Sequence, residues 1–390
     1  MRKLFFDIQI TGHHSEYISH LIDYLFINNN LTDEYFFVVH PEFSERFPEI
    51  ALKAKKLKNI VWIEIGIEEF NKSQRGSLIR SSFSLYKIMD SYAKQYKVDH
   101  VILLYFNTFQ LSCIFYRSHY SISGILFLQF YRMNKNKIAD KLKYYRKYLI
   151  TKLYTLNNKI DTIFVLNDQK TVNYLNNEFR TSQFKMLPDP VPILSPIPGF
   201  DIYEHYNIDR NRKIFLHIGS LGDRKGTFEI IEAVKYIQDD MQNEIAILLV
   251  GKANEHETQL LSLKLKKVID ESKITVLWDK QFVSSETMKS LFDQCFAVLI
   301  PYKNAEASSG ILGHAAAANK AVIAPKSGLL KDIIEDYNLG VLIDRVESNL
   351  IADAIESLAD SNYSLNKNQD FIGLHTTDIF VKKLLCKNYL

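Results

Sequence analysis

The sequence predicts an α/β protein of two Rossmann-like domains, each built on a parallel sheet. Short apolar runs alternate with longer segments of helical periodicity along the chain, which is the pattern of βαβ units. The chain has 390 residues, more than one hydrophobic core usually supports. Residues 187–200 (LPDPVPILSPIPGF) contain five prolines. Proline fixes φ and removes a backbone donor, so this segment is expected to link the two halves.

The periodicity also predicts the individual elements. We expect domains over residues 1–190 and 200–370, and one last amphipathic helix over 371–388, so that the terminal segment 371–390 packs back on the first domain. In the first half the expected strands are 4–10, 35–40, 60–65, 100–105, 125–131 and 162–166, and the expected helices are 16–27, 78–96 and 138–154. In the second half they are strands 213–218, 245–250, 274–278, 297–300, 321–324 and 341–343, and helices 227–237, 257–269, 286–294, 310–318 and 350–358.

Composition excludes several classes of protein. A hydrophobic fraction of 47% and a charged fraction of 24% are those of an ordinary globular protein, and a net charge of +3 does not indicate nucleic-acid binding. The three cysteines lie far apart without a CxxC spacing, which argues against a disulfide framework or a zinc site and favours a reducing, cytoplasmic location. The stretch 101–116 is too short and too polar to span a membrane, and Asp7 interrupts the apolar start, so neither reads as a membrane segment.

The first chemical motif is FLHIGSLGDRKG, residues 215–226. A buried strand runs into a loop with three glycines, after which a helix begins. Glycines allow backbone N–H groups to approach a ligand, and a helix start adds partial positive charge. Arg224 and Lys225 add full charges, so the loop suits a diphosphate. The alternative is a tight βα turn with a solvated Arg-Lys pair.

The second motif is PYKNAEASSGILGHAAAANKAVIA, residues 301–324. A strand ends at Pro301, a loop contains Glu306, and Ser308 or Ser309 is placed to cap a helix that begins near Gly310. Glu306 can accept hydrogen bonds from sugar hydroxyls, and His314 lies about two helical turns further on. The alternative is a capped structural helix with a buried histidine.

Together the two motifs resemble the C-terminal domain of the family four retaining glycosyltransferases, which have the GT-B fold of two Rossmann-like domains facing each other across a cleft. Gly219, Leu221, Lys225 and Gly226 match the family's G-x-L-x-x-x-K-G loop, and Glu306 matches the first of its two glutamates. The resemblance implies a nucleotide-sugar donor. It also implies that Arg224 and Lys225 stabilise the leaving diphosphate and that Glu306 orients the donor sugar, with Gly219, Ser308, Ser309 and Gly310 beside the donor.

The chain departs from the family at two positions. Ser220 stands where the family often has arginine, and Arg224 is placed to supply the missing cation. His314 stands where the family has its second glutamate, which binds the nucleotide ribose. Histidine can also hydrogen-bond a ribose hydroxyl, so we expect altered donor contacts and retained activity.

In the first half, Gly12 resembles the glycine loop that faces the donor phosphates and the acceptor in these enzymes, and His13 or His14 is expected to line the cleft. The alternative for these histidines is ordinary capping or solvent exposure. Rough alignment places Gln129, with Tyr131 nearby, where many relatives have a histidine, so no obvious catalytic base appears in this half. His13, Glu16 and His20 have helical spacing, but without an HExxH pattern we expect no metal site. No Asp-x-Asp pair occurs in the chain, so we expect protein cations to do the work of a metal ion.

Residues 132–159 are dense in lysine, arginine and tyrosine, with Asp140 as the one acidic residue. Such a segment can bind an anionic membrane surface, and the alternative is a solvated helix face.

The expected function is retaining, metal-independent transfer of a sugar from a nucleotide-sugar donor. The expected acceptor is a glycan or a lipid-linked molecule, in surface polysaccharide or glycoconjugate synthesis. The enzyme would be cytoplasmic, peripheral at the inner membrane face, and without a nucleic-acid partner. The alternatives are a sugar-nucleotide epimerase on a related fold and a non-catalytic nucleotide-binding relative.

Overall fold

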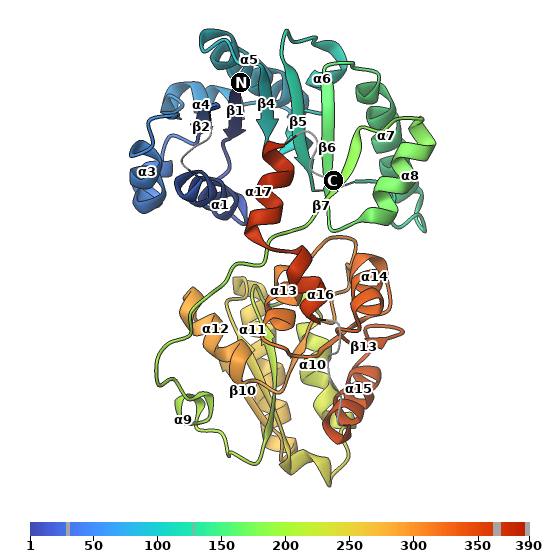
Figure 1. Ribbon diagram of the computed structural model, residues 1–390. Helices are drawn as coiled ribbons and strands as arrows, with labels where there is room; N and C mark the ends of the chain where they lie inside the picture. Colours follow the sequence, from blue (N-terminus) through green and yellow to red (C-terminus); the bar gives the residue numbers. More distant parts are fainter. Residues whose placement is uncertain (29–31, 128, 362–367, 387–390) are drawn as a thin grey trace. The chain divides into compact units, whose positions relative to one another are not determined.

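The computed structural model describes residues 1–28, 32–127, 129–361 and 368–386. The chain forms two compact units (Figure 1). Unit 1 comprises Met1–Pro188 together with the segment that starts at Thr377, and unit 2 comprises Asp189–Thr376. None of the described helices combines the length and the apolar character that crossing a bilayer requires.

Unit 1 is built on a sheet of seven parallel strands in the order β3-β2-β1-β4-β5-β6-β7. The central strands are almost fully buried, as expected for a parallel sheet covered on both faces. Their bounds are β1 Arg2–Asp7, β2 Glu34–Val39, β3 Ile60–Glu64, β4 His100–Leu103, β5 Ser121–Leu126, β6 Ile160–Leu166 and β7 Phe184–Leu187.

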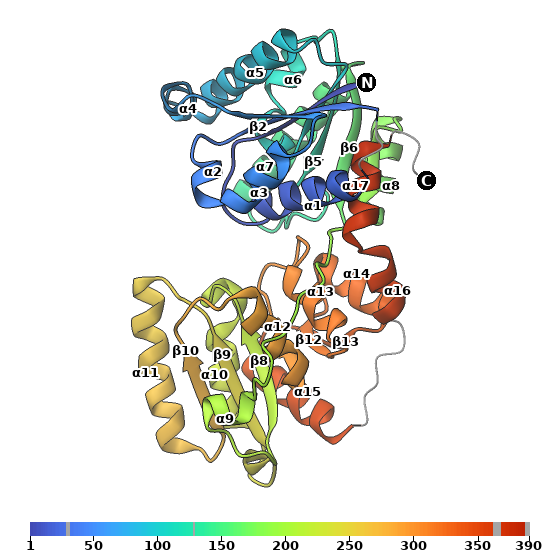
Figure 2. The same ribbon diagram turned by 60° about the vertical axis from the view of Figure 1, so that its left-hand side comes forward.

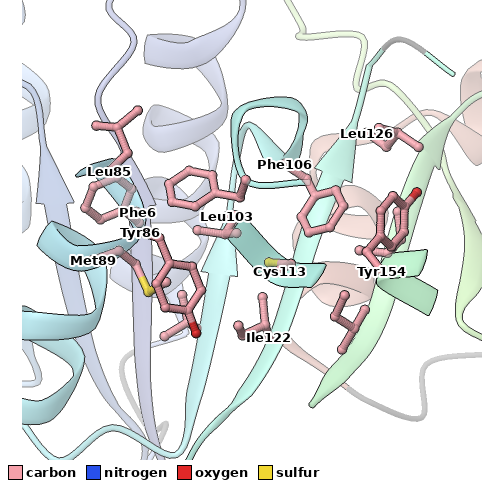
Figure 3. Packing of buried hydrophobic residues seen from close by; sticks show 14 of the residues in the cluster. Phe6, Leu85, Tyr86, Met89, Leu103, Phe106, Cys113, Ile122, Leu126 and Tyr154 are labelled. Atoms are coloured by element: carbon pink, nitrogen blue, oxygen red, sulfur yellow. The ribbon is translucent and has the colours of Figure 1, made fainter. Parts of the chain in front are cut away.

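Side chains alternate between the two faces of this sheet, and each face packs against its own helices. Figure 3 shows the core on the face of β1 that carries Phe6, where Leu103, Phe106 and Tyr154 pack together. The opposite face carries Phe5 and packs against α1 and α17. The helices are α1 His14–Ile27, α2 Phe43–Arg46, α3 Pro48–Lys55, α4 Ile67–Gln74, α5 Leu78–Gln95, α6 Ser112–Phe115, α7 Ile138–Thr155, α8 Gln169–Phe179 and α17 Thr377–Leu385.

Unit 2 is built on a sheet of six parallel strands in the order β10-β9-β8-β11-β12-β13 (Figure 2). Two apolar cores cover its two faces. The strands are β8 Lys213–Ile218, β9 Ile245–Val250, β10 Thr275–Asp279, β11 Ala297–Leu299, β12 Val322–Pro325 and β13 Gly340–Ile343. The helices are α9 Ile202–Tyr206, α10 Thr227–Ala233, α11 Glu255–Glu271, α12 Ser285–Gln294, α13 Gly310–Ala317, α14 Gly328–Tyr337, α15 Ser348–Asp360 and α16 Asn368–Leu374.

Both sheets reverse their strand order at one point, between β1 and β4 in unit 1 and between β8 and β11 in unit 2. In open parallel sheets, ligands bind outside the carboxyl ends of the strands at this switch point. The loops that follow β1, β4, β8 and β11 are therefore the places to look for function.

The prolines between the units do not form a free linker. The backbone N–H of Val191 donates to the His375 carbonyl at 2.8 Å, and that of Ile197 donates to Ser290 Oγ at 2.8 Å. Val191 also packs closely against Gly313, since a Cβ added at Gly313 would lie only 2.7 Å from Val191 Cγ2. Residues 189–200 are thus packed along unit 2.

Two sequence predictions about elements are wrong. The fifth strand was predicted over 125–131, but it begins at Ser121 and ends at Leu126. Its start was missed because the polar residues Ser121 and Ser123 interrupt the apolar pattern. The single helix predicted over 371–388 is in fact two helices: α16 ends at Leu374 and α17 begins at Thr377. Only α17 belongs to unit 1, whereas α16 belongs to unit 2. Residues 387–390 of that prediction lie outside the described residues.

Candidate active site

The loop after β8 depends on glycine for its shape. Gly219 and Gly226 have φ of 122° and 70°, in the left-handed region that favours glycine. A Cβ at Gly226 would lie 2.2 Å from the carbonyl oxygen of Pro301, far inside van der Waals contact. The residue at 226 must therefore be glycine for the loop after β8 and the segment after β11 to approach this closely.

A buried chain of hydrogen bonds through His217 and Thr227 fixes the conformation of the same loop. The Gly222 N–H donates to Thr227 Oγ1 at 2.9 Å, and Thr227 Oγ1 lies 2.9 Å from His217 Nε2. His217 Nδ1 lies 2.8 Å from the Leu299 carbonyl oxygen, which can only accept. Nδ1 therefore carries the proton, and Nε2 accepts from the threonine hydroxyl.

Burial lowers the pKa of His217 to about 4, with the charge of Lys225 acting in the same direction. The imidazole is therefore neutral near neutral pH, which matches the proton positions in the chain of hydrogen bonds. Neither His217 nor Thr227 was predicted from the sequence. The available signal was a histidine inside a buried strand followed, ten residues later, by the first residue of a helix.

Lys225 lies against the second loop. Its Nζ is 3.5 Å from the ring centroid of Tyr302, a cation–π contact. Burial lowers the pKa of Lys225 to about 8, and the neighbouring Arg224 charge adds to the shift. Burial also raises the pKa of Tyr302 to about 12, so this phenol stays neutral. The backbone N–H of Lys303 donates to the Arg224 carbonyl at 3.1 Å, which joins the two loops directly.

The carboxylates nearest to Arg224 and Lys225 pair with a different lysine. Lys303 forms ion pairs with Asp223 and with Glu229, the latter at 2.7 Å. Within the described part of the chain, neither Arg224 nor Lys225 forms an ion pair. Two adjacent cations without a carboxylate partner, one of them with a lowered pKa, favour the approach of an anion.

The loop after β11 is held by its own backbone. The Glu306 N–H donates to Asn304 Oδ1 at 3.0 Å, and the Leu329 N–H donates to the Ala305 carbonyl at 2.8 Å. Glu306 is half-buried and lies three residues beyond the contact between the two loops. Ser220, on the first loop, is exposed.

The predicted side-chain cap of α13 is wrong. Ser309 occupies the N-cap position, but its side chain makes no capping hydrogen bond. Ser308 Oγ donates to Asp189 Oδ2 at 3.3 Å. Gly310 is the first residue of the helix, and the ring of His314 packs on Phe292 at 5.7 Å between centroids.

In unit 1 the structure brings His14 and Asp7 together. Asp7, the last residue of β1, is buried, and its Oδ2 lies 2.7 Å from His14 Nδ1. Asp7 Oδ1 accepts from the Gln9 N–H at 3.0 Å. The ring of His14 also contacts Tyr105, which follows β4, at 5.4 Å between centroids. This pair lies at the switch point of the first sheet, and Asp7 was missed because one polar residue ending an apolar strand is a weak signal.

The other predicted residues of unit 1 are arranged differently. Gly12 is exposed with φ of 71°, and His13 is exposed with its Nδ1 3.3 Å from Glu16. Gln129 Oε1 accepts from the Tyr131 N–H at 2.5 Å, so this side chain folds back on its own turn. The ring of Tyr131 stacks on Tyr174 of α8, with centroids 4.4 Å apart. Across the described ranges, no group of three histidine, cysteine or acidic side chains is placed to hold a metal ion.

Comparison with known proteins agrees with this geometry. Residues 201–372 match the sequence profile of the family described as "Glycosyl transferases group 1". A search of curated protein sequences finds no match.

Many solved structures share the fold, although their sequence identity to this chain is low. WaaG, a glycosyltransferase involved in lipopolysaccharide biosynthesis, is 14% identical with a TM-score of 0.65 over 99% of this chain and 100% of its own. Anabaena HepE, solved in complex with UDP-glucose, is 13% identical with a TM-score of 0.66 over 98% of each chain. Sucrose-phosphate synthase from Thermosynechococcus elongatus is 15% identical with a TM-score of 0.68 over 98% of this chain and 96% of its own. The chain therefore has the GT-B fold, and residues 201–372 of its second unit match the group 1 glycosyltransferase profile.

Proposed function

We propose that this enzyme transfers a sugar from a nucleotide-sugar donor with retention of configuration, and that unit 2 binds the donor. The observation that supports this most strongly is the pair of cations, Arg224 and Lys225, at a glycine loop that contacts the segment after β11. Both loops follow strands at the switch point of the sheet, where parallel α/β sheets bind their ligands.

In the proposed reaction the bond between the sugar and the diphosphate breaks, and negative charge develops on the departing phosphate oxygen. Arg224, Lys225 and the backbone N–H groups at the start of α13, near Ser309 and Gly310, stabilise that charge. An acceptor hydroxyl forms the new bond on the face that the diphosphate leaves. Its proton goes to the departing phosphate oxygen, so no separate base is needed. These cations take the part that a metal ion plays in other transferases.

The remaining donor contacts are assigned by position. Glu306 orients the donor sugar through its hydroxyls, and His314 hydrogen-bonds the nucleotide ribose. Gly219 and Ser220 bring loop backbone close to the donor. Ser308 supports the loop through its bond to Asp189.

On the acceptor side we assign His14, oriented by Asp7, to contact an acceptor hydroxyl. Asp7 Oδ2 can only accept, so the proton of a neutral His14 lies on Nδ1 and leaves Nε2 as an acceptor. The loop containing Gly12 and His13 is exposed beside this histidine. Gln129 and Tyr131 stay proposed acceptor-side residues, and Tyr131, which stacks on Tyr174, is 37% exposed.

UDP-glucose is the first donor to test, because HepE of Anabaena, which shares this fold, was solved with UDP-glucose. The proposed acceptor is a glycan or lipid-linked molecule in surface polysaccharide or glycoconjugate synthesis, the broader field to which WaaG also belongs. We propose a cytoplasmic location at the inner membrane face, where the basic segment 132–159 would meet anionic lipid. The free cysteines Cys113, Cys295 and Cys386 suit that reducing compartment.

The test is calorimetric titration of UDP-glucose and UDP into the full chain and into Arg224→Met, Lys225→Met and the exposed control Lys235→Met. We expect both site variants to weaken binding about tenfold or more, since each removes a charged hydrogen-bond donor. The control should bind like the wild type. If all four proteins bind equally well, the cation pair is not the diphosphate site.

A second measurement separates transfer from its rivals. UDP release that requires an added glycan or lipid-linked acceptor, with the anomeric configuration kept in the product, is the expected result. Isomerised sugar in a mixture without acceptor would indicate an epimerase instead. Donor binding with no turnover on any acceptor would indicate a binding protein.

A further inference from the structure

Helix α7 of unit 1 has apolar side chains on two opposite faces. Tyr144, Thr151 and Tyr154 face inward and are buried, and Phe106 packs edge-on against Tyr154 at 5.2 Å between centroids. Six apolar residues point away from the core and are between 38% and 79% exposed. These six, here called the outer stripe, are Ile138, Leu142, Tyr145, Leu149, Leu153 and Leu156.

The spacing of the outer stripe makes it continuous. The intervals are four, three, four, four and three residues, and at 100° per residue the six side chains fall within an arc of about 80°. Exposed apolar residues elsewhere do not line up in this way. On α11, for comparison, the exposed Leu260 and Leu263 share a face over a single turn, but the exposed Ile269 points to another side of the helix. A contiguous exposed apolar strip indicates a surface that binds something.

Basic side chains flank the outer stripe on both sides. Lys141 and Lys152 lie along one edge and Arg146 along the other, and all three are exposed. Among the described residues none of the three forms an ion pair. A helix with an apolar face bordered by lysine and arginine matches the interfacial layer of an anionic bilayer, where the apolar face enters the acyl boundary and the cations meet headgroups.

The buried inner face prevents α7 from hiding the outer stripe by rolling over. Rotation would expose Tyr154, which is fully buried, and would break the edge-on contact between Tyr144 and Phe130 at 5.1 Å. Pairing of two copies through their stripes would bring six flanking cations together, which is unfavourable. We therefore infer that α7 is an interfacial helix that inserts its outer stripe into an anionic membrane surface, with its axis along the bilayer plane.

This inference deepens the membrane location in the proposed function, because it adds apolar insertion to the attraction between charges. It is independent of sugar transfer. Vesicle binding is therefore measured without nucleotide, and UDP-glucose binding is measured separately by calorimetry. A failure of one leaves the other intact.

The experiment is co-sedimentation of the full chain with vesicles of phosphatidylcholine alone or mixed with phosphatidylglycerol, at low and high salt. Three variants are compared with the wild type: Leu142→Ser with Leu149→Ser, the neutralised Lys141→Gln with Arg146→Gln and Lys152→Gln, and the control Leu263→Ser. Leu263 is 69% exposed, close to the 67% of Leu142, but lies on α11 of the other unit.

We expect the wild type and the control to bind only the vesicles that contain phosphatidylglycerol. The affinity of the leucine variant for these vesicles should be lower by about tenfold or more at both salt concentrations, because it loses buried apolar area. The neutralised variant should bind less at low salt and resemble the wild type at high salt.

Three results would overturn the inference. The first is wild-type affinity in the leucine variant, which would mean that the stripe does not insert. The second is absence of wild-type binding to either vesicle. The third is self-association of the wild type that the leucine variant abolishes, which would make a second copy the partner.

Discussion

His14 Nδ1 and Asp7 Oδ2 lie 2.7 Å apart across the turn that joins β1 to α1. The carboxylate is buried and accepts a second hydrogen bond from the Gln9 N–H, so it has little freedom to turn away. A buried carboxylate that fixes one ring nitrogen leaves the other nitrogen in a defined orientation, which is useful for holding a hydroxyl.

We predict that His14→Ala and Asp7→Asn lower acceptor-dependent turnover while leaving donor affinity near that of the wild type. The first variant removes the ring and the second weakens its orientation, so the loss should be larger for His14→Ala, on the order of 10²-fold. Turnover and calorimetric UDP affinity are measured side by side. Equal turnover in His14→Ala and the exposed control His119→Ala would remove His14 from the acceptor site.

Donor affinity should depend on pH through Lys225. The pKa of this lysine lies near 8 in the free protein, and an anion binds more strongly to the protonated form. Affinity for UDP should therefore be greatest below about pH 8 and fall as the pH rises towards about 10, where the free lysine is neutral. Calorimetry across this range is the measurement. Lys225→Arg keeps its charge throughout and should flatten the profile, whereas an unchanged slope in that variant would assign the titration to another group.

The hydrogen-bond chain beneath the glycine loop can be tested with Thr227→Val. Valine matches threonine in shape but leaves the Gly222 N–H and His217 Nε2 without a partner, which should cost about 1–3 kcal/mol of unfolding free energy. Thr227→Ser keeps the hydroxyl and should restore most of the loss. Urea unfolding gives the free energies, and UDP titration shows whether the loop still binds. Similar stability in the valine and serine variants would contradict the proposed chain.

The contact between Gly226 and Pro301 can be separated from simple backbone strain. Gly226 and Gly199 have nearly the same φ, 70° and 72°, but a Cβ at Gly199 would meet nothing within 4 Å. Alanine at either position carries a similar conformational cost of about 1 kcal/mol. Only Gly226→Ala should also push the two loops apart and abolish measurable UDP binding. Comparable UDP affinity in both variants would show that the close approach of the loops is not needed.

The periodicity of the sequence was enough to predict the fold class, because buried parallel strands and amphipathic helices leave clear patterns. Strand β8 was predicted from Lys213 to Ile218, the bounds the structure shows. Short or polar strands left weaker patterns. Strand β7 has four residues and was missed, and the serines of β5 hid its start.

The loops of the candidate donor site were identified from glycines and charges, but their mutual contact was not. Sequence spacing cannot show that Lys225 lies over Tyr302, or that Asp7 meets His14, because such contacts depend on how separate strands are ordered in the sheet. The Thr227–His217 pair was hidden for the same reason. Their side chains meet across a strand and a helix that no local pattern joins.

The path of the chain through its two units has a consequence for biosynthesis. Helix α17 completes unit 1, where Phe380 packs on Tyr17 and Lys3 Nζ donates to the Leu385 carbonyl at 3.1 Å. The ribosome delivers this helix only after the whole of unit 2. During translation the α1 face of the first sheet therefore stays incompletely covered until α17 emerges. By that time unit 2 already has all the residues of its own core. Emergence of α17, not emergence of β7, sets the moment at which the first unit can close.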